Sequence, residues 1–126
     1  MSAKVVRFGI AFAAAVVLPV LLAQSGLFVR LGAHPWWGVQ TALIGAPIGA
    51  SLAMLPWLDG KRFILGLAVL GLSAAAAMYG KSQFAASYAE DAFAGALWYY
   101  GWIGIALGDA LIVAALVLFV FPKRVA

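Results

Sequence analysis

The residues from Trp98 to Phe121 include a single Asp, Glu, Lys or Arg, which is Asp109. At about 1.5 Å of rise per residue, Asp109 lies near the middle of a helix that crosses a membrane here. A charge at that depth costs at least ~2.5–3.5 kcal/mol on insertion scales, so we expect the carboxyl group to be protonated unless it is paired. Such an acid can relay protons or cations, contact a partner subunit, or link helices through a hydrogen bond worth about 1 kcal/mol.

Few polar groups are available to satisfy the Asp109 carboxyl. Ser73 and Thr41 offer hydroxyl groups, and Pro47 frees a backbone carbonyl near Leu43 because proline has no N–H donor. No lysine or arginine occurs at this depth. A membrane enzyme needs several polar groups that converge at one depth, so we expect no enzymatic activity and no catalytic residue.

Other polar residues fall near the ends of the apolar stretches. Gln24 and Gln40 lie near the outer ends of two stretches, where they either bond to each other or reach interfacial water. His34 is the only histidine, and one imidazole supplies neither a zinc site nor bis-histidine haem ligation. Glu90 and Asp91 are adjacent, which is a weak metal signal and is typical of a solvated loop. The chain has no cysteine, and we expect no metal site and no cofactor.

The composition requires lipid as a neighbour. The 126 residues are 67% hydrophobic and 10% charged, whereas a soluble domain is about half apolar and about a quarter charged. The net charge is +4, but most basic residues stand in pairs at the ends of apolar runs, which is a topology signal and not a nucleic-acid surface. We therefore expect an integral membrane protein that is surrounded by the lipid bilayer and binds no nucleic acid.

Four stretches are long enough to cross a bilayer as helices, which takes about 20 residues. Continuous apolar runs without alternation do not suit the strands of a membrane barrel. The sequence therefore predicts an all-α, polytopic bundle of four transmembrane helices that forms one domain over residues 1–126. The first stretch has an alternative interpretation as a signal peptide cleaved after Ala23, because a basic start and an apolar middle precede it. The stretches are residues 8–28, 36–55, 63–79, which continues towards residue 87, and 98–121.

The Lys and Arg residues of the short loops predict which side of the membrane each loop faces. Six fall on the side of the termini and two on the other side. We therefore expect both termini in the cytoplasm, and the chain in a cytoplasmic membrane such as a bacterial inner membrane. The six are Lys4, Arg7, Lys61, Arg62, Lys123 and Arg124, and the two are Arg30 and Lys81.

Two connections are predicted from turn residues and polarity. Asp59 and Gly60, within residues 56–62 (PWLDGKR), mark a tight cytoplasmic turn that makes the second and third spans an antiparallel hairpin. Residues 80–97 are predicted to form the longest outer loop, which is polar enough for an interfacial helix.

Large aromatic side chains gather where two spans enter from the outer side. Trp and Tyr prefer this depth because the ring suits the headgroup zone while the N–H or O–H group stays hydrated. We interpret these residues as an anchoring belt, with an aromatic ligand site as the alternative. They are Trp36, Trp37, Trp98, Tyr99, Tyr100 and Trp102.

Glycines recur at a spacing of four residues in two spans. In lipid, small residues let helix backbones approach closely, and van der Waals contact then holds the helices together. We expect these faces to pack within the bundle, with packing against another copy or subunit as the alternative. The residues are Gly45 and Gly49 in the second span and Gly101, Gly104 and Gly108 in the fourth.

Two functions from different classes are compatible with these features. The first is a non-enzymatic accessory or structural subunit that packs against itself or against a larger membrane complex. The second is a small oligomeric transporter or channel, proton-coupled through Asp109. The sparse polar lining of the four spans favours the first.

Overall fold

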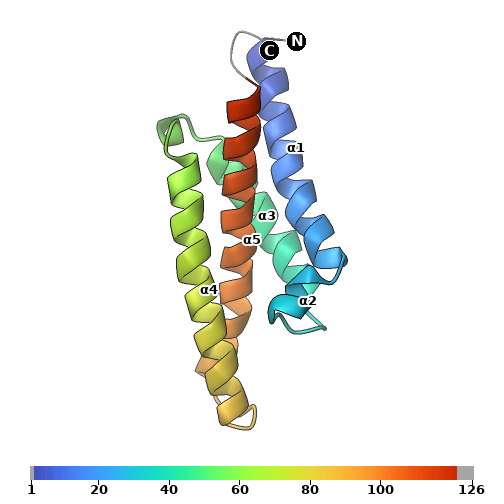
Figure 1. Ribbon diagram of the computed structural model, residues 1–126, viewed down its shortest axis with the longest axis vertical. Coiled ribbons are helices and arrows are strands. Elements are labelled where there is room, and N and C mark those ends of the chain that lie inside the picture. Colours follow the sequence, from blue (N-terminus) through green and yellow to red (C-terminus); the bar gives the residue numbers. More distant parts are fainter. Residues whose placement is uncertain (1, 122–126) are drawn as a thin grey trace.

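A computed structural model describes residues 2–121 of the chain. Within this range the chain is all-α and has no strand, which confirms the all-α class predicted from the sequence. Four helices run along the length of the molecule, and two short ones lie in the connections (Figure 1). The elements are α1 (Ala3–Gln24), α2 (Leu27–Leu31), α3 (Gly38–Ala53), the 3₁₀ helix η1 (Pro56–Leu58), α4 (Arg62–Ala86) and α5 (Ala92–Val120).

Three helices, α1, α4 and α5, are long and apolar enough to cross a membrane. The helix α3 has 16 residues, or about 24 Å at 1.5 Å per residue, and is shorter than the apolar stretch 36–55 that predicted it. It begins only at Gly38 because residues 35–37 form a turn. It ends at Ala53, shortly before Pro56, which cannot continue a helix.

The first apolar stretch, residues 8–28, becomes two helices. The α1 helix starts early because Ser2 Oγ caps it by accepting a hydrogen bond of 3.2 Å from the Val5 N–H. It ends before Gly26, whose φ of 89° lies in the left-handed region that helix ends favour. The remaining residues form the separate short helix α2.

The α5 helix is the centre of the bundle. The helices α1, α3 and α4 each pack against α5, and α1 also packs against α3. The consecutive helices α3 and α4 run antiparallel, as predicted for the second and third spans, but they make almost no contact and do not pack as a hairpin. Instead α4 pairs with α5, and Figure 1 shows α4 on the opposite side of α5 from α1.

The start of α1 and the end of α5 lie at the same end of the molecule (Figure 1). The Arg7 guanidinium confirms this, because its Nη2 donates to the Leu118 carbonyl over 2.6 Å. The start of α4 lies there too, since the Arg62 guanidinium stands 5.6 Å from the centre of the Phe8 ring. We call this the basic end, and it carries Lys4, Arg7, Lys61 and Arg62. Lys123 and Arg124 lie outside the described residues.

The predicted outer loop over residues 80–97 is wrong. The α4 helix continues to Ala86 and α5 begins at Ala92, so only residues 87–91 connect them. The polar residues Lys81 and Gln83, which suggested a loop, are exposed on α4. The α4–α5 hairpin therefore extends past α2 at the end opposite the basic end (Figure 1).

The tip of this hairpin is fixed by two side chains. Ser87 Oγ accepts hydrogen bonds from the Glu90 N–H over 3.2 Å and the Asp91 N–H over 2.9 Å. Asp91 Oδ1 then accepts from the Ala94 N–H over 3.0 Å and caps α5. Glu90 therefore belongs to an exposed turn and Asp91 to a helix cap, which agrees with the solvated loop predicted for these two residues.

The buried core consists mainly of alanine, which lets the helices approach closely. Pro19 and Pro47 lie inside α1 and α3, and neither ends its helix. The largest core cluster joins α1, α3 and α5 through Ala11, Ala15, Ala46, Ala50, Ala110 and Ala114.

Candidate functional site

The α3–α5 contact depends on two glycines. A Cβ atom at Gly45 would fall on the Ile103 carbonyl oxygen and 2.9 Å from Ala106 Cβ. A Cβ atom at Gly49 would fall on the Leu107 carbonyl oxygen. Only hydrogen fits at both positions, so the backbones of the two helices touch here.

The α4–α5 contact is equally close. Cβ atoms at Gly101 and Gly108 would lie 2.7 Å from Ala77 Cα and 2.8 Å from the Leu70 backbone nitrogen. A Cβ atom at Gly104 would meet the Ser73 hydroxyl. All five glycines singled out in the sequence therefore pack within the chain, as expected, and are not free for a partner.

Asp109 points between these two contacts. Its neighbours Gly108 and Ala110 face α4 and α3, respectively, and residues of an α-helix follow each other at about 100°. The Asp109 side chain therefore lies on the strip of α5 between α3 and α4. This strip, here called the Asp109 face, includes Ile105 one turn away and Leu116 two turns away. Ile105 is buried, Asp109 is half-buried and Leu116 is exposed.

The hydroxyl groups predicted to bond to Asp109 are engaged or lie at other levels. Thr41 is fully buried, and its Oγ1 donates to the Gly38 carbonyl over 2.6 Å. Ser73 lies at the level of Gly104, more than one turn from Asp109. Within residues 2–121 the structure records no hydrogen bond of the Asp109 carboxyl.

The remaining polar candidates do not reach Asp109 either. The predicted partner was the backbone carbonyl near Leu43 that Pro47 frees, and within residues 2–121 no hydrogen bond joins it to Asp109. Gln24 and Gln40 are exposed, and within residues 2–121 no hydrogen bond joins them. Within residues 2–121 the structure does not bring the predicted polar set together around Asp109.

The predicted aromatic belt forms a cluster around His34. The His34 ring lies 5.7 Å from that of Trp37, in stacked geometry, and 5.6 Å from that of Trp98, in edge geometry. The Trp98 indole N–H donates to the Gly32 carbonyl over 2.9 Å, and Lys81 stands 5.9 Å from the Trp98 ring centre. The cluster joins the loop between α2 and α3 to both helices of the α4–α5 hairpin, and we call this region the aromatic end.

The six aromatics divide by environment. Trp36 is 91% exposed and Tyr100 is also exposed, as an anchoring belt requires. Trp102 is 5% exposed and packs on Phe28 of α2, with ring centres 5.0 Å apart. Trp102 is therefore a core residue of this bundle, which sequence spacing alone did not reveal.

Two arginines at the basic end were missed as structural residues. Arg62 is 6% exposed, and its Nε donates to the Ala53 carbonyl at the end of α3 over 2.6 Å. Arg7 donates to the Leu118 and Phe121 carbonyls at the end of α5. Each arginine therefore satisfies carbonyls that a helix end leaves without partners. The carbonyl partners lie in other helices, so local sequence carries no signal for these contacts.

The chemistry available at these sites is limited. Within residues 2–121 no three His, Cys, Asp or Glu side chains group closely enough to hold a metal ion. Asp109 can donate or accept a hydrogen bond or exchange a proton, and the basic end can attract an anion. No protein family, no curated protein and no solved structure matches the chain.

Proposed function

We propose that this chain is a non-enzymatic membrane protein that acts as an accessory or structural subunit and assembles through the Asp109 face. The observation that carries the proposal is the half-buried Asp109 carboxyl, which has no hydrogen bond within residues 2–121 and points between α3 and α4. In lipid, a polar side chain without a partner is unfavourable, and a helix of another copy or subunit can supply one.

The packing of the glycines supports the choice of this face. Assembly through the glycine pairs would require opening the α3–α5 or α4–α5 contact, since both are closed at backbone distance. The Asp109 face is the part of α5 between those contacts. A partner helix would therefore approach α5 at Asp109, since Ile105 on the same face is already buried within the chain.

We further propose that α3 is a fourth membrane span and that the basic end is cytoplasmic. The helices α1 and α4 both start at the basic end, so a chain that crosses the membrane in α1 must return before α4 begins. The α3 helix lies along α5 and is the segment available for that return. The excess of Lys and Arg at this end supports the cytoplasmic orientation.

The subunit proposal is tested by isolating the protein from its native membrane in a polymer that retains lipid. Native mass spectrometry should then find the chain with a second copy or with a different membrane protein. A chain that emerges only as a lone monomer, at every concentration tested, would contradict the proposal.

Orientation is tested separately with single cysteines, because the chain contains none. Glu90→Cys, in the α4–α5 connection, should react with an impermeant thiol reagent added outside intact cells, and Ser2→Cys should not. The reverse labelling would overturn the cytoplasmic placement of the basic end.

A second candidate function is a small oligomeric transporter or channel that uses Asp109 for proton coupling. The mid-span position of this acid favours it, but none of the three cavities described for the chain is lined by Asp109. Proton-driven flux in reconstituted vesicles that disappears with Asp109→Asn would promote this candidate over the subunit.

A further inference from the structure

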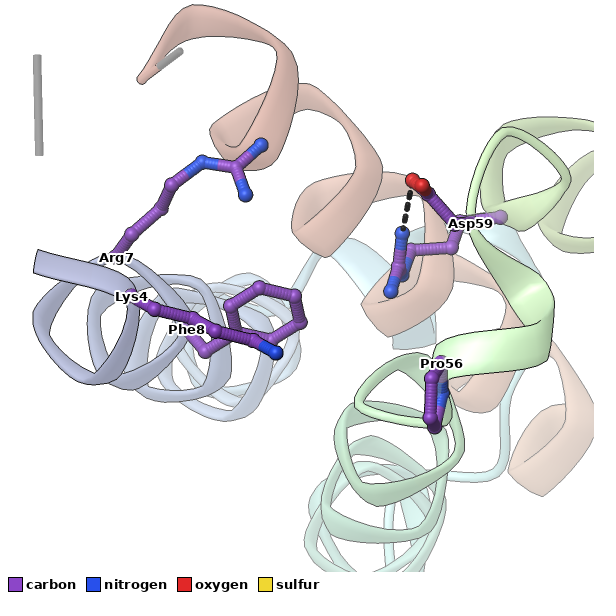
Figure 2. A pocket seen from close by; sticks show the side chains of 6 residues that line it. Lys4, Arg7, Phe8, Pro56 and Asp59 are labelled. Carbon is purple, nitrogen blue, oxygen red and sulfur yellow. Dashed lines mark hydrogen bonds and ion pairs between the residues drawn. The ribbon is translucent and has the colours of Figure 1, made fainter. Parts of the chain in front are cut away.

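The basic end contains a cavity between the start of α1 and the connection from α3 to α4. It has a volume of about 280 Å³ and is lined by Lys4, Arg7, Phe8, Pro56, Asp59 and Arg62. Figure 2 shows Lys4, Arg7 and Phe8 of α1 on one side of the cavity, with Pro56 and Asp59 on the other. The guanidinium carbons of Arg7 and Arg62 each stand 5.6 Å from the centre of the Phe8 ring.

The lining carries more positive than negative charge. Three cationic side chains face one carboxylate, that of Asp59, which lies 3.4 Å from the Arg62 guanidinium. The hydrogen bonds of Arg7 go to neutral carbonyls, those of Leu118 and Phe121. Backbone carbonyls fix the orientation of a guanidinium but do not neutralise its charge, so Arg7 retains capacity for an anion.

A second, apolar cavity continues from the first. It has a volume of about 450 Å³ and shares Arg7, Asp59 and Arg62 with the charged cavity. From there it runs between the start of α4 and the last turns of α5, along Phe63 and Leu116. Its remaining lining residues are Gly60, Ala115, Leu118 and Phe119.

We propose that these joined cavities bind one anionic glycerophospholipid, with its phosphate at Lys4 and Arg7 and an acyl chain along Phe63, Leu116 and Phe119. Arg62 is 6% exposed and already bonded to Ala53, Leu55 and Asp59, so it forms a wall of the site and not a phosphate ligand. The charged part lies at the end of three apolar helices, where lipid headgroups are found. Basic pockets between membrane helices suit anionic headgroups, while a zwitterionic headgroup gains less from the two cations Lys4 and Arg7. The apolar cavity distinguishes a lipid from a free phosphate ion, because an ion gains nothing from Phe63 or Leu116.

The experiment is native mass spectrometry of the full chain in detergent, titrated with phosphatidylglycerol or with phosphatidylcholine of the same acyl chains. Phosphatidylglycerol should bind about tenfold more tightly, as expected for charge-assisted contacts. Lys4→Gln should weaken phosphatidylglycerol binding about fivefold and should weaken phosphatidylcholine binding less, because the choline cation offsets the charge of its phosphate. Asp59→Asn should strengthen phosphatidylglycerol binding, because it removes the carboxylate that competes with the phosphate.

Arg30→Gln is the matched control, since Arg30 is an exposed basic residue of α2 at the other end of the bundle. This variant should bind phosphatidylglycerol as the wild type does. An equal loss in Lys4→Gln and Arg30→Gln, or equal binding of the two lipids by the wild type, would overturn the proposal in favour of general charge attraction.

A third arm separates the lipid from an inorganic anion. Phe119→Ser, in the apolar cavity, should weaken binding of long-chain phosphatidylglycerol severalfold. Inorganic phosphate, added at concentrations equal to the lipid, should not displace it. Displacement by phosphate, together with no effect of Phe119→Ser, would reduce the site to an anion site and would contradict the lipid proposal.

Discussion

The contacts of α5 with α3 and α4 differ in kind from the Asp109 face between them. At the contacts, glycines bring backbone atoms together so closely that no Cβ atom fits. On the Asp109 face, a half-buried carboxyl lies between a buried Ile105 and an exposed Leu116. The difference indicates that packing within the chain is completed by small residues, while the Asp109 carboxyl forms no hydrogen bond in that packing within residues 2–121.

The largest effect is expected where the backbone contact is closest. Gly45→Leu should destabilise the bundle by about 3 kcal/mol, because the new side chain would have to displace the Ile103 carbonyl and separate α3 from α5. The measurement is unfolding in sodium dodecyl sulfate followed by circular dichroism. Gly71→Leu is the control, since no atom lies within 4 Å of a Cβ atom there. Equal losses in the two variants would show that the glycine contact does not govern stability.

The class of fold and the internal role of the glycines could be predicted from the sequence, because both depend on local composition and spacing. Continuous apolar runs allow only helices in lipid, and glycines four residues apart lie on one side of a helix. The pairing of α4 with α5 instead of α3 was not predictable in this way, since it depends on which glycine surfaces fit each other in three dimensions.

The candidate site was predicted only in part. Asp109 stood out because it is the one acid in a long apolar run. Its partners depend on how deep each residue of the other helices lies relative to Asp109, and sequence distance does not give that depth. Ser73 and Thr41 belong to helices of opposite direction, so their depths relative to Asp109 follow from packing alone. Arg7 and Arg62 were read as topology signals, while their carbonyl partners lie in other helices.

Removal of a buried cap should have the next largest effect. Arg62→Gln should destabilise the bundle by about 2 kcal/mol, because the Ala53 carbonyl loses a charged donor at the end of α3. The same unfolding assay applies, with Arg30→Gln as an exposed control that should change stability by less than about 0.5 kcal/mol. If Arg62→Gln were as stable as Arg30→Gln, the hydrogen bond from Arg62 to the Ala53 carbonyl would not contribute to the stability of the bundle.

The aromatic end should contribute less per residue. Trp98→Phe removes the hydrogen bond from the indole to the Gly32 carbonyl and should cost about 1 kcal/mol. Trp36→Phe, at a side chain that is 91% exposed, should cost clearly less in the same assay. A larger cost for Trp36 than for Trp98 would contradict a stabilising role of the hydrogen bond from Trp98 to Gly32.

The smallest effect is expected for the tyrosine hydroxyls. Tyr99→Phe should keep stability within about 0.5 kcal/mol, because the ring contact with Trp37 at 5.2 Å does not require the hydroxyl. Assembly and any flux in vesicles should also be unchanged. A large and specific loss in either assay would indicate an aromatic ligand site in place of the anchoring belt.

The most direct measurement of the assembly claim is the association equilibrium of Asp109 variants with the partner, or with a second copy, in detergent micelles. Asp109→Leu should weaken association by about 0.6–2 kcal/mol, the value of one interhelical hydrogen bond, and Asp109→Asn should retain it because the amide still bonds. Leu72→Ala, at an exposed position of α4 away from the Asp109 face, should have no effect. Unchanged association of Asp109→Leu would contradict the account.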